Sequence, residues 1–222
     1  MLRQTPWVRM KTAASLDGTT ALANGQSQWI TSPEARADGH AWRARASAVL
    51  TGIGTVLQDN PGLDVRLVPC SRQPHRIIID SALQTPLDAR IFMPEGEVWI
   101  YTASQDAAKT RALQARGASV HCLPGSNGKV DLAAVLRDLG QRQINELHVE
   151  AGFKLNGSLV REGLVDEFLV YLAPKLLGPG QGMVSLAALP ALADALALEF
   201  MSVERVGPDL RLLARVPGRG NF

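Results

Sequence analysis

The sequence predicts an α/β domain in which helices cover both faces of a mostly parallel sheet. Short apolar runs alternate with helical segments, as expected for successive β-α units. The run at 75–80, His-Arg-Ile-Ile-Ile-Asp, is β-branched with polar ends, which is typical of a strand buried on both faces. Residues 200–205 and 210–215 predict a terminal antiparallel hairpin. We see no linker and no repeat, so we expect one domain spanning 1–222, with its core at about 6–216.

The composition is that of an ordinary soluble globular protein, with 46% apolar residues, 20% charged residues and a formal net charge of +2. This charge does not favour nucleic acid or a membrane surface, and 5% aromatic residues offer few stacking platforms. The N-terminus lacks the apolar segment of a signal peptide, and no apolar run approaches the ~20 residues of a membrane span. Two distant cysteines and four scattered histidines predict neither a disulfide framework nor a metal site, so we expect a cytoplasmic protein.

The first expected strand, residues 7–15, carries Arg9 and Lys11 on one face. A lysine in a first core strand is unusual. One interpretation is an edge strand with the lysine charge in solvent, and the other is a functional lysine.

A helix is expected from Ser32 to about Ala46, because Ser32 before Pro33 is typical of an N-cap followed by proline at N1. Thr31 and Glu34 also fit a capping box. The helix carries three arginines, Arg36, Arg43 and Arg45. They predict a solvated face or, if one of them faces a crevice, a phosphate clamp.

The middle of the chain continues the alternation. We expect strands at 48–51, 75–80, 98–102 and 118–123, and helices at 55–59, 104–116 and 131–139. Gly52-Ile-Gly54-Thr55 forms a glycine turn that lets the backbone approach a ligand, although G-x-G alone is a weak signal. Further on, residues 165–173 predict a long strand, and the glycine-rich residues 177–182 predict a flexible loop that could act as a flap.

Residues 144–160 combine a strand, a glycine turn and a helix. Polar Glu146, His148 and Glu150 alternate with apolar residues, which predicts a strand with one solvated face. Gly152 ends the strand, and a helix that begins there points free N–H groups at any bound anion. We therefore expect a phosphate-binding turn beside a working carboxylate, Glu150. The alternative is an ordinary strand-to-helix connection with a surface glutamate.

Six motifs together resemble one family, the reductase domain of the bacterial bifunctional riboflavin-biosynthesis deaminase–reductase. They are Lys11-Thr-Ala-Ala-Ser15-Leu-Asp-Gly18, Ser27-Gln-Trp-Ile-Thr-Ser32, Gly54-Thr55-Val with Asp59-Asn-Pro-Gly-Leu-Asp-Val-Arg66, Ile79-Asp-Ser81, Val149-Glu-Ala-Gly152 and Ala173-Pro-Lys-Leu-Leu-Gly178. The resemblance covers residues from about Trp7 to about Arg215. It implies a dihydrofolate-reductase-like fold, with NADPH across the C-terminal edge of the sheet. It also implies reduction of 5-amino-6-(5-phosphoribosylamino)uracil, with hydride delivered to ribose C1′.

The same resemblance implies roles for individual residues. The polar triad around the ribose consists of Lys11, Asp59 and Glu150. The substrate contacts are Ser27, Arg43, Leu63, Arg66 and Glu150, with Arg43 and Arg66 as the phosphate clamp. The NADPH contacts are Ala13, Trp29, Thr55, Asp59, Ser81, Gly152, Phe153, Lys154, Leu155, Asn156, Gly157 and Ser158. A homodimer is implied as well, and residues 165–173 with the loop at 176–189 are candidates for its interface.

The chain departs from the bifunctional family in one respect. The zinc deaminase signatures H-x-E and P-C-x-x-C are not in this sequence, so the chain is expected to be an excised domain, the product of a split gene or a free-standing relative, and a separate deaminase is one possible partner. Two other substrates stay open, namely the undeaminated 2,5-diamino-pyrimidinone and a dihydrofolate-like compound. A non-catalytic NADPH-binding module is the third interpretation.

Overall fold

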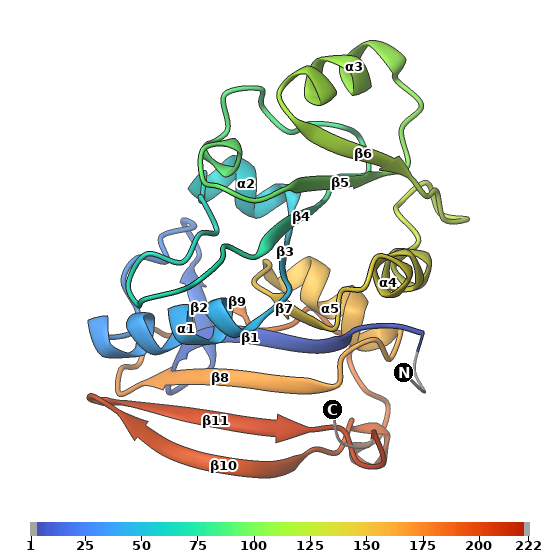
Figure 1. Cartoon of the computed structure of the whole chain (residues 1–222). Coiled ribbons are helices and arrows are strands. Elements are labelled where there is room, and N and C mark those ends of the chain that lie inside the picture. The colour runs from blue at the N-terminus through green and yellow to red at the C-terminus, as the bar shows by residue number, and fades with distance from the viewer. Residues whose placement is uncertain (1–3, 220–222) are drawn as a thin grey trace. The chain divides into compact units, whose positions relative to one another are not determined.

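The computed structural model describes residues 4–219, which divide into two compact units. Of the described residues, 4–6 and 40–151 form the first unit, and 7–39 and 152–219 form the second. Helix α1 (Pro33–Arg45) begins in the second unit and ends in the first (Figure 1). None of the helices within residues 4–219 is long and apolar enough to cross a membrane.

The first unit is built on a parallel sheet with strand order β7-β3-β4-β5-β6 (Figure 1). Its elements are β3 (Ala48–Gly52), α2 (Ile53–Asp59), β4 (His75–Ile79), η1 (Arg90–Phe92), β5 (Val98–Thr102), α3 (Ala107–Ala115), β6 (Ala118–Cys122), α4 (Leu132–Gln141) and β7 (Glu146–Val149). Buried apolar side chains of its strands and of α2 and α3 form one core, including Val49, Val56, Ile78, Ile100 and Leu113. The expected alternation of strands and helices is confirmed.

The second unit contains parallel and antiparallel pairings. Its elements are β1 (Trp7–Ser15), β2 (Thr19–Leu22), α5 (Phe153–Arg161), β8 (Glu167–Ala173), β9 (Gly180–Gly182), η2 (Leu192–Asp194), β10 (Glu199–Val206) and β11 (Asp209–Arg215). Strand β8 is parallel to β1 and antiparallel to β11, and β10 pairs antiparallel with β11. The predicted C-terminal hairpin is therefore confirmed, and it adds antiparallel strands beside the parallel pair β1 and β8.

The charges of β1 do not lie in solvent. Arg9 is 2% exposed, and its Nε donates to Oε1 of Glu167 at 2.5 Å. Arg215 donates to the second oxygen of the same carboxylate at 2.8 Å. Arg9, which was expected to share a face with Lys11, is therefore a buried, paired charge. A buried arginine is tolerated here because a carboxylate on the neighbouring strand satisfies it.

The segment at 177–182, expected to be a flexible flap, is hydrogen-bonded along its length. Gly180–Gly182 is strand β9, which pairs antiparallel with β2. The carboxylate of Asp17 accepts the backbone N–H groups of Leu177 and Gly178, the latter at 2.7 Å. Hydrogen bonds from Ser15 and from these two amides hold the pKa of Asp17 below its ordinary value. The expectation missed these contacts because β2 and β9 are short and far apart in sequence.

Helix α1 begins as the sequence predicted. The Oγ atom of Ser32 accepts the backbone N–H of Ala35 at 3.2 Å, which is the N-cap interaction. Its arginines are not simply a solvated face, because Arg36 donates to the carbonyl of Thr31 at 2.7 Å and Arg43 contacts Glu150.

Candidate functional site

Glu150 directly follows the last residue of β7, and both its backbone N–H and its backbone carbonyl are hydrogen-bonded. Its N–H donates to the carbonyl of Leu50, and its own carbonyl accepts from Oγ1 of Thr51, both at 2.8 Å. Its carboxylate accepts two hydrogen bonds from Arg43, from Nε and, at 2.9 Å, from Nη2. The two side chains are 13% and 15% exposed. Glu150 is therefore a fixed acceptor at the end of a parallel strand.

The Arg43 guanidinium is held in its charged form. Burial alone would lower the pKa of Arg43, but the charge and hydrogen bonds of Glu150 outweigh burial and raise it. A carboxylate in a two-point pair with a permanent cation accepts hydrogen bonds and is a poor proton donor. This geometry suits Glu150 to receive hydroxyl protons in hydrogen bonds rather than to release its own.

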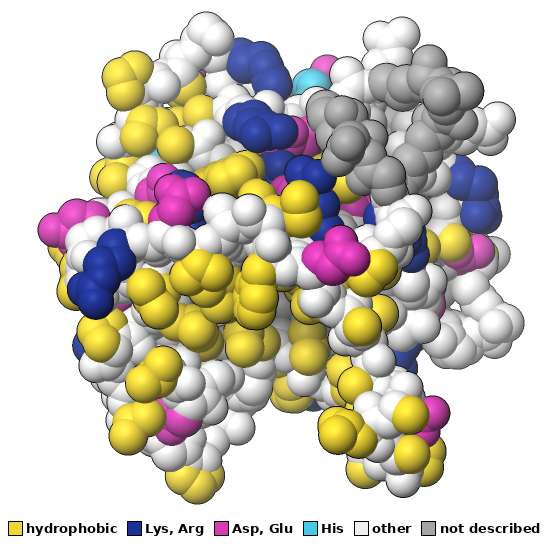
Figure 2. All heavy atoms as spheres, turned by 90° about the horizontal axis from the view of Figure 1, so that it is seen from below, with side chains coloured by type: hydrophobic (Ala, Val, Ile, Leu, Met, Phe, Trp, Pro, Cys, Tyr) yellow, Lys and Arg dark blue, Asp and Glu magenta, His cyan; other side chains and the backbone are white. Residues whose placement is uncertain are grey.

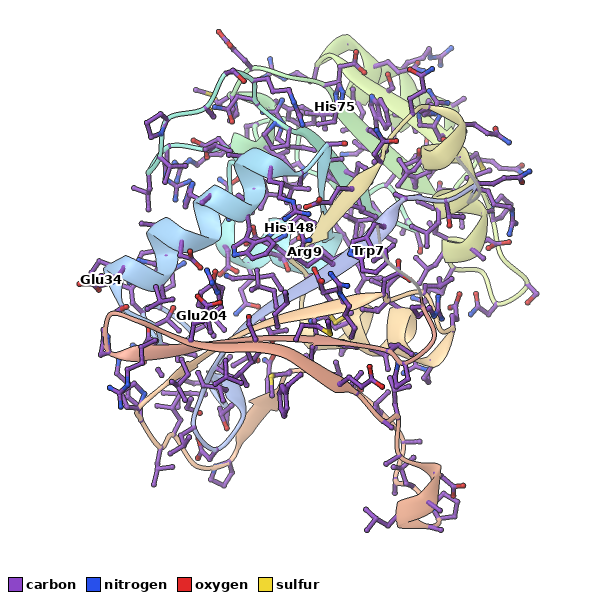
Figure 3. The ribbon with its side chains drawn as sticks, turned by 60° about the horizontal axis from the view of Figure 1, so that its bottom comes forward. Trp7, Arg9, Glu34, His75, His148 and Glu204 are labelled. Carbon is purple, nitrogen blue, oxygen red and sulfur yellow. The ribbon has the colours of Figure 1, made fainter. Side chains whose placement is uncertain are left out.

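The polar face of β7 is buried, which corrects the expectation of a solvated face. Glu146 is 4% exposed and His148 is fully buried. Nε of Arg45 donates to Glu146 at 2.9 Å. His148, labelled in Figure 3, has its Nε2 3.3 Å from Oε1 of Glu150. A strand face covered by arginines has the same polar–apolar alternation as a solvated face. Sequence alternation alone cannot separate these two cases.

Leu63 and Arg66 belong to a short segment after α2, and Arg43 contacts this segment at Asp64. Nη1 of Arg43 donates to the carbonyl of Asp64 at 2.9 Å, and Nη1 of Arg66 donates to the Asp64 carboxylate at 2.8 Å. Leu63 is buried, whereas the Arg66 side chain is 54% exposed. The structure therefore gathers Arg43, Leu63, Arg66 and Glu150, four of the five expected substrate contacts, within the first unit.

Asp59 and Thr55 lie on α2, also in the first unit. Asp59 is the last residue of this helix, and partial burial raises the pKa of its otherwise exposed carboxyl. Within residues 4–219, no hydrogen bond or ion pair is found between Asp59 and Glu150 or Arg43. Ser81 follows β4, and its Oγ accepts the backbone N–H of Val130 at 3.1 Å.

Lys11 and Ala13 lie on β1 in the second unit. Nζ of Lys11 lies 5.8 Å from the centre of the Tyr171 ring, a cation–π distance. The Tyr171 hydroxyl donates to Asp38 at 2.5 Å, and Arg211 donates to the same carboxylate at 2.9 Å. Lys11 therefore lies against an aromatic ring that α1 and β11 hold in place. No sequence pattern indicated Tyr171, because its link to Lys11 is a contact between distant strands.

Ser27 and Trp29 lie in the connection before α1. Nζ of Lys175 donates to the carbonyls of Trp29 and Ile30, the latter at 2.9 Å. The Arg36 guanidinium lies 4.5 Å from the exposed Trp29 ring. These contacts fix the backbone of this connection and leave the indole ring open to solvent.

The turn at 152–158 separates into two parts. Gly152 caps α5 without a side-chain hydrogen bond, and the first turn of α5 has no acidic residue. Asn156 is buried and donates to the carbonyl of Met183 at 3.1 Å. A methyl group on Gly157 would collide with the carbonyl of Ser185. The first turn of α5 is therefore available to an anion, whereas Asn156 and Gly157 are used in packing. The other residues of this turn, Phe153, Lys154, Leu155 and Ser158, are exposed or half-buried.

Comparison with known proteins gives a consistent assignment. The RibD C-terminal domain family matches residues 6–212. The riboflavin biosynthesis protein RibD of Escherichia coli (strain K12) is 42% identical over 224 residues, which cover 93% of this chain and 59% of that protein. The 5-amino-6-(5-phosphoribosylamino)uracil reductase of Buchnera aphidicola subsp. Acyrthosiphon pisum is 31% identical over 205 residues, which cover 86% of this chain and 97% of that protein.

Solved structures share the fold. Acinetobacter baumannii RibD (form 2) has a TM-score of 0.84 and 34% identity, over 96% of this chain and 58% of that one. Dihydrofolate reductase from Enterococcus faecalis, complexed with NADP(H), has a TM-score of 0.53 and 10% identity, over 95% of this chain and 96% of that one. The expected dihydrofolate-reductase-like fold is confirmed. The chain spans 59% of the length of the E. coli RibD that it matches.

Proposed function

Because this chain belongs to the RibD C-terminal domain family, we propose that it is an NADPH-dependent reductase of riboflavin biosynthesis. The proposed reaction converts 5-amino-6-(5-phosphoribosylamino)uracil into its ribitylamino product by reduction at ribose C1′. Similarity to the Buchnera reductase, which this chain covers almost completely, supports the substrate class. The observation that carries the proposal is the fixed Glu150–Arg43 pair beside the segment that bears Arg66.

Glu150, Arg66 and Arg43 each have a chemical task in this proposal. Arg43 and His148 lie against the Glu150 carboxylate and fix its direction, and we assign this carboxylate to hydrogen bonds with sugar hydroxyls. Arg66 is more than half exposed and has a planar fork of N–H donors that suits a phosphate. We assign Arg66 to the 5′-phosphate. Arg43 contributes to the phosphate clamp mainly in an indirect way, because it holds the Glu150 carboxylate and the Asp64 carbonyl in place.

We assign Lys11 to the reacting end of the substrate, together with Asp59 as a group that can carry a proton. Lys11 keeps its ammonium over an aromatic face, which supports a cation without neutralising it. Partial burial raises the pKa of Asp59, which favours its protonated form relative to a fully exposed aspartate. Ser27 is assigned to the substrate as well.

The NADPH assignment fits the residues at the start of α5. An uncapped helix N-terminus whose first turn has no acidic residue suits a pyrophosphate, and Lys154 adds a positive charge in that turn. We assign this turn to the pyrophosphate, and Ala13, Trp29, Thr55 and Ser81 to further contacts with the cofactor. When bound, NADPH would supply the hydride. The protein would supply orientation and electrostatic support.

The proposal is tested by the loss of NADPH absorbance with the phosphoribosylamino-uracil generated in place by a separate deaminase. A control without the deaminase contains only the diamino precursor. Oxidation that requires the deaminase is the expected result and identifies a uracil reductase. Oxidation in both tubes would indicate a diaminopyrimidine-type substrate, and oxidation of NADPH by dihydrofolate would indicate a folate-type reductase. Binding of NADPH without turnover in any tube would refute the proposal.

We also propose that the chain works as a homodimer in a reducing cytoplasm. Strand β10 is at the edge of its sheet, and Phe200 on it is 70% exposed. Further exposed apolar side chains lie at Met201 and Val203 and, in the 176–189 segment, at Leu176, Leu186 and Leu189. Apolar side chains gather on the face viewed from below in Figure 2, the direction in which Figure 1 places β10. An exposed apolar edge of this kind favours pairing with a strand of a second copy of the chain.

Phe200→Glu should convert the dimer to monomer in light scattering. A wild-type monomer would refute this assignment.

A further inference from the structure

The segment Leu63–Arg66 is held through its backbone by side chains from elsewhere in the first unit. Leu63 has a φ of 53°, a left-handed conformation that is uncommon for leucine. The side-chain amide of Gln73 pairs with Val65 in both directions. The N–H of Val65 donates to Oε1 at 2.7 Å, and Nε2 donates to the Val65 carbonyl at 2.9 Å. The Gln73 side chain therefore pairs with the Val65 backbone as the backbone of a neighbouring β-strand would. Such support is what allows an unfavourable conformation to persist.

Helix α1 holds the same segment at two further points. Nη1 of Arg43 donates to the Asp64 carbonyl, and Nδ1 of His40 accepts the Arg66 N–H at 3.2 Å. His40 and Arg43 are three residues apart on α1, so they share a helix face. Three consecutive residues of the segment, Asp64 to Arg66, are thus fixed by side chains.

The hydrogen bond to Arg66 defines the chemical state of His40. An imidazole nitrogen that accepts an N–H carries no proton itself, so the neutral ring carries its proton on Nε2. His40 is 5% exposed. Burial, followed by the charges of Arg43 and Arg66, lowers the pKa of His40 to about 4. His40 therefore remains a neutral acceptor throughout the physiological range.

Arg66 is the more exposed of the two charged residues in the segment 63–66. Its backbone N–H is fixed by His40, whereas its side chain is 54% exposed and bonded to Asp64. A guanidinium has five N–H donors, and a phosphate is recognised best by donors whose direction is set before binding. A rigid backbone beneath an exposed guanidinium provides this arrangement.

We propose that His40 and Gln73 are positioning residues that set the direction of Arg66 toward the phosphate of the substrate. This inference rests on the proposed function, in which Arg66 reads that phosphate. His40 and Gln73 do not contact the substrate themselves. They act through the backbone of the segment 63–66.

The test uses a matched pair of variants of the full chain. In His40→Asn, the side-chain oxygen can replace Nδ1 as the acceptor, whereas His40→Leu keeps a similar volume without an acceptor. His40→Leu should raise KM for the phosphorylated substrate by roughly three- to tenfold, the effect of losing one hydrogen bond. The value of kcat and the KM for the dephosphorylated analogue should stay close to wild type. His40→Asn should restore most of the affinity, and Gln73→Leu should behave like His40→Leu from the other side of the segment.

A second measurement separates this inference from the proposed function. In nuclear magnetic resonance, inorganic phosphate titrated into the wild-type chain should shift the Arg66 side-chain signal and raise the pKa of His40, because the anion offsets the arginine charges. His40→Leu should weaken the Arg66 shift, and His40→Asn should not. An inactive wild-type chain would refute the proposed function and leave this titration as the test. Equal phosphate responses in both variants, or equal KM increases for both substrates, would overturn the positioning role.

Discussion

Acidification should destabilise the folded chain through His40, and the size of the effect follows from its surroundings. The pKa of His40 is lowered from 6.5 to about 4 by burial and by the charges of Arg43 and Arg66. Between these two values the unfolded chain binds a proton that the folded chain excludes. Stability therefore rises with pH across this window and is lost as pH falls below 6.5. Above pH 6.5 both states are neutral at this site, and the effect vanishes.

The expected loss can be worked out for a change from pH 7 to about pH 5. The difference between 6.5 and about 4 corresponds to a limit of about 3 kcal/mol, reached only below the folded pKa. At pH 5 the unfolded histidine is almost fully protonated and the folded one is largely neutral, which gives a loss of about 2 kcal/mol. His40 is 5% exposed, so solvent screening removes little of this value.

Urea denaturation of wild type and His40→Asn at several pH values measures this quantity. Asparagine does not titrate, and the other three histidines are common to both proteins, so their contributions cancel in the difference. The stability of wild type relative to His40→Asn should fall by about 2 kcal/mol between pH 7 and pH 5. A difference that does not change with pH would refute the assignment of His40 as a buried neutral acceptor.

Three further predictions concern single substitutions. Lys11→Ala should abolish turnover while NADPH affinity, measured by fluorescence, stays close to wild type; unchanged turnover would remove Lys11 from the mechanism. Arg66→Ala should raise KM far more for the phosphorylated substrate than for its dephosphorylated analogue, by a charge-assisted contact of roughly 1.5–3 kcal/mol. Equal increases would mean that Arg66 does not read the phosphate. Gly157→Ala should lower the unfolding free energy by about 1–3 kcal/mol, because the new methyl group meets the Ser185 carbonyl. Full stability in urea would show that the Ser185 segment moves aside.

The regular elements could be predicted because their signals are local. The N-cap at Ser32 and the β-branched run of β4 each specify a structure within a few residues. The placement of Glu150 at a strand end also followed from a local break at Gly152. The resemblance in sequence then supplied the candidate residues that no local signal could connect.

The contacts that define the site are long-range, and for this reason the sequence does not show them. Arg43 and Glu150 are separated by 107 positions, and Arg9 and Glu167 by 158. A charged side chain in a short strand is ordinarily interpreted as solvated, because burial without a partner is strongly unfavourable. Only the folded structure supplies the partner. His40 escaped notice for a related reason, since a single histidine on a helix has no pattern that distinguishes an acceptor from a surface residue.

Glu150 and Asp59, both in the first unit, have different surroundings and therefore suit different chemical roles. Glu150 is tied to Arg43 through both of its oxygens, which stabilises the ionised form and leaves it a fixed acceptor. Among residues 4–219 no arginine pairs with Asp59 in this way, and partial burial raises its pKa instead of lowering it. Reduction at a sugar carbon needs an acceptor that orients hydroxyl groups and, separately, a group that exchanges a proton during ring opening. In the proposed reaction, the surroundings of the two carboxylates therefore favour the first task for Glu150 and the second for Asp59.

Glu150→Gln would then weaken substrate orientation across all pH values, whereas Asp59→Asn would remove the acidic limb of the pH–rate profile. The reverse pattern would exchange the two roles.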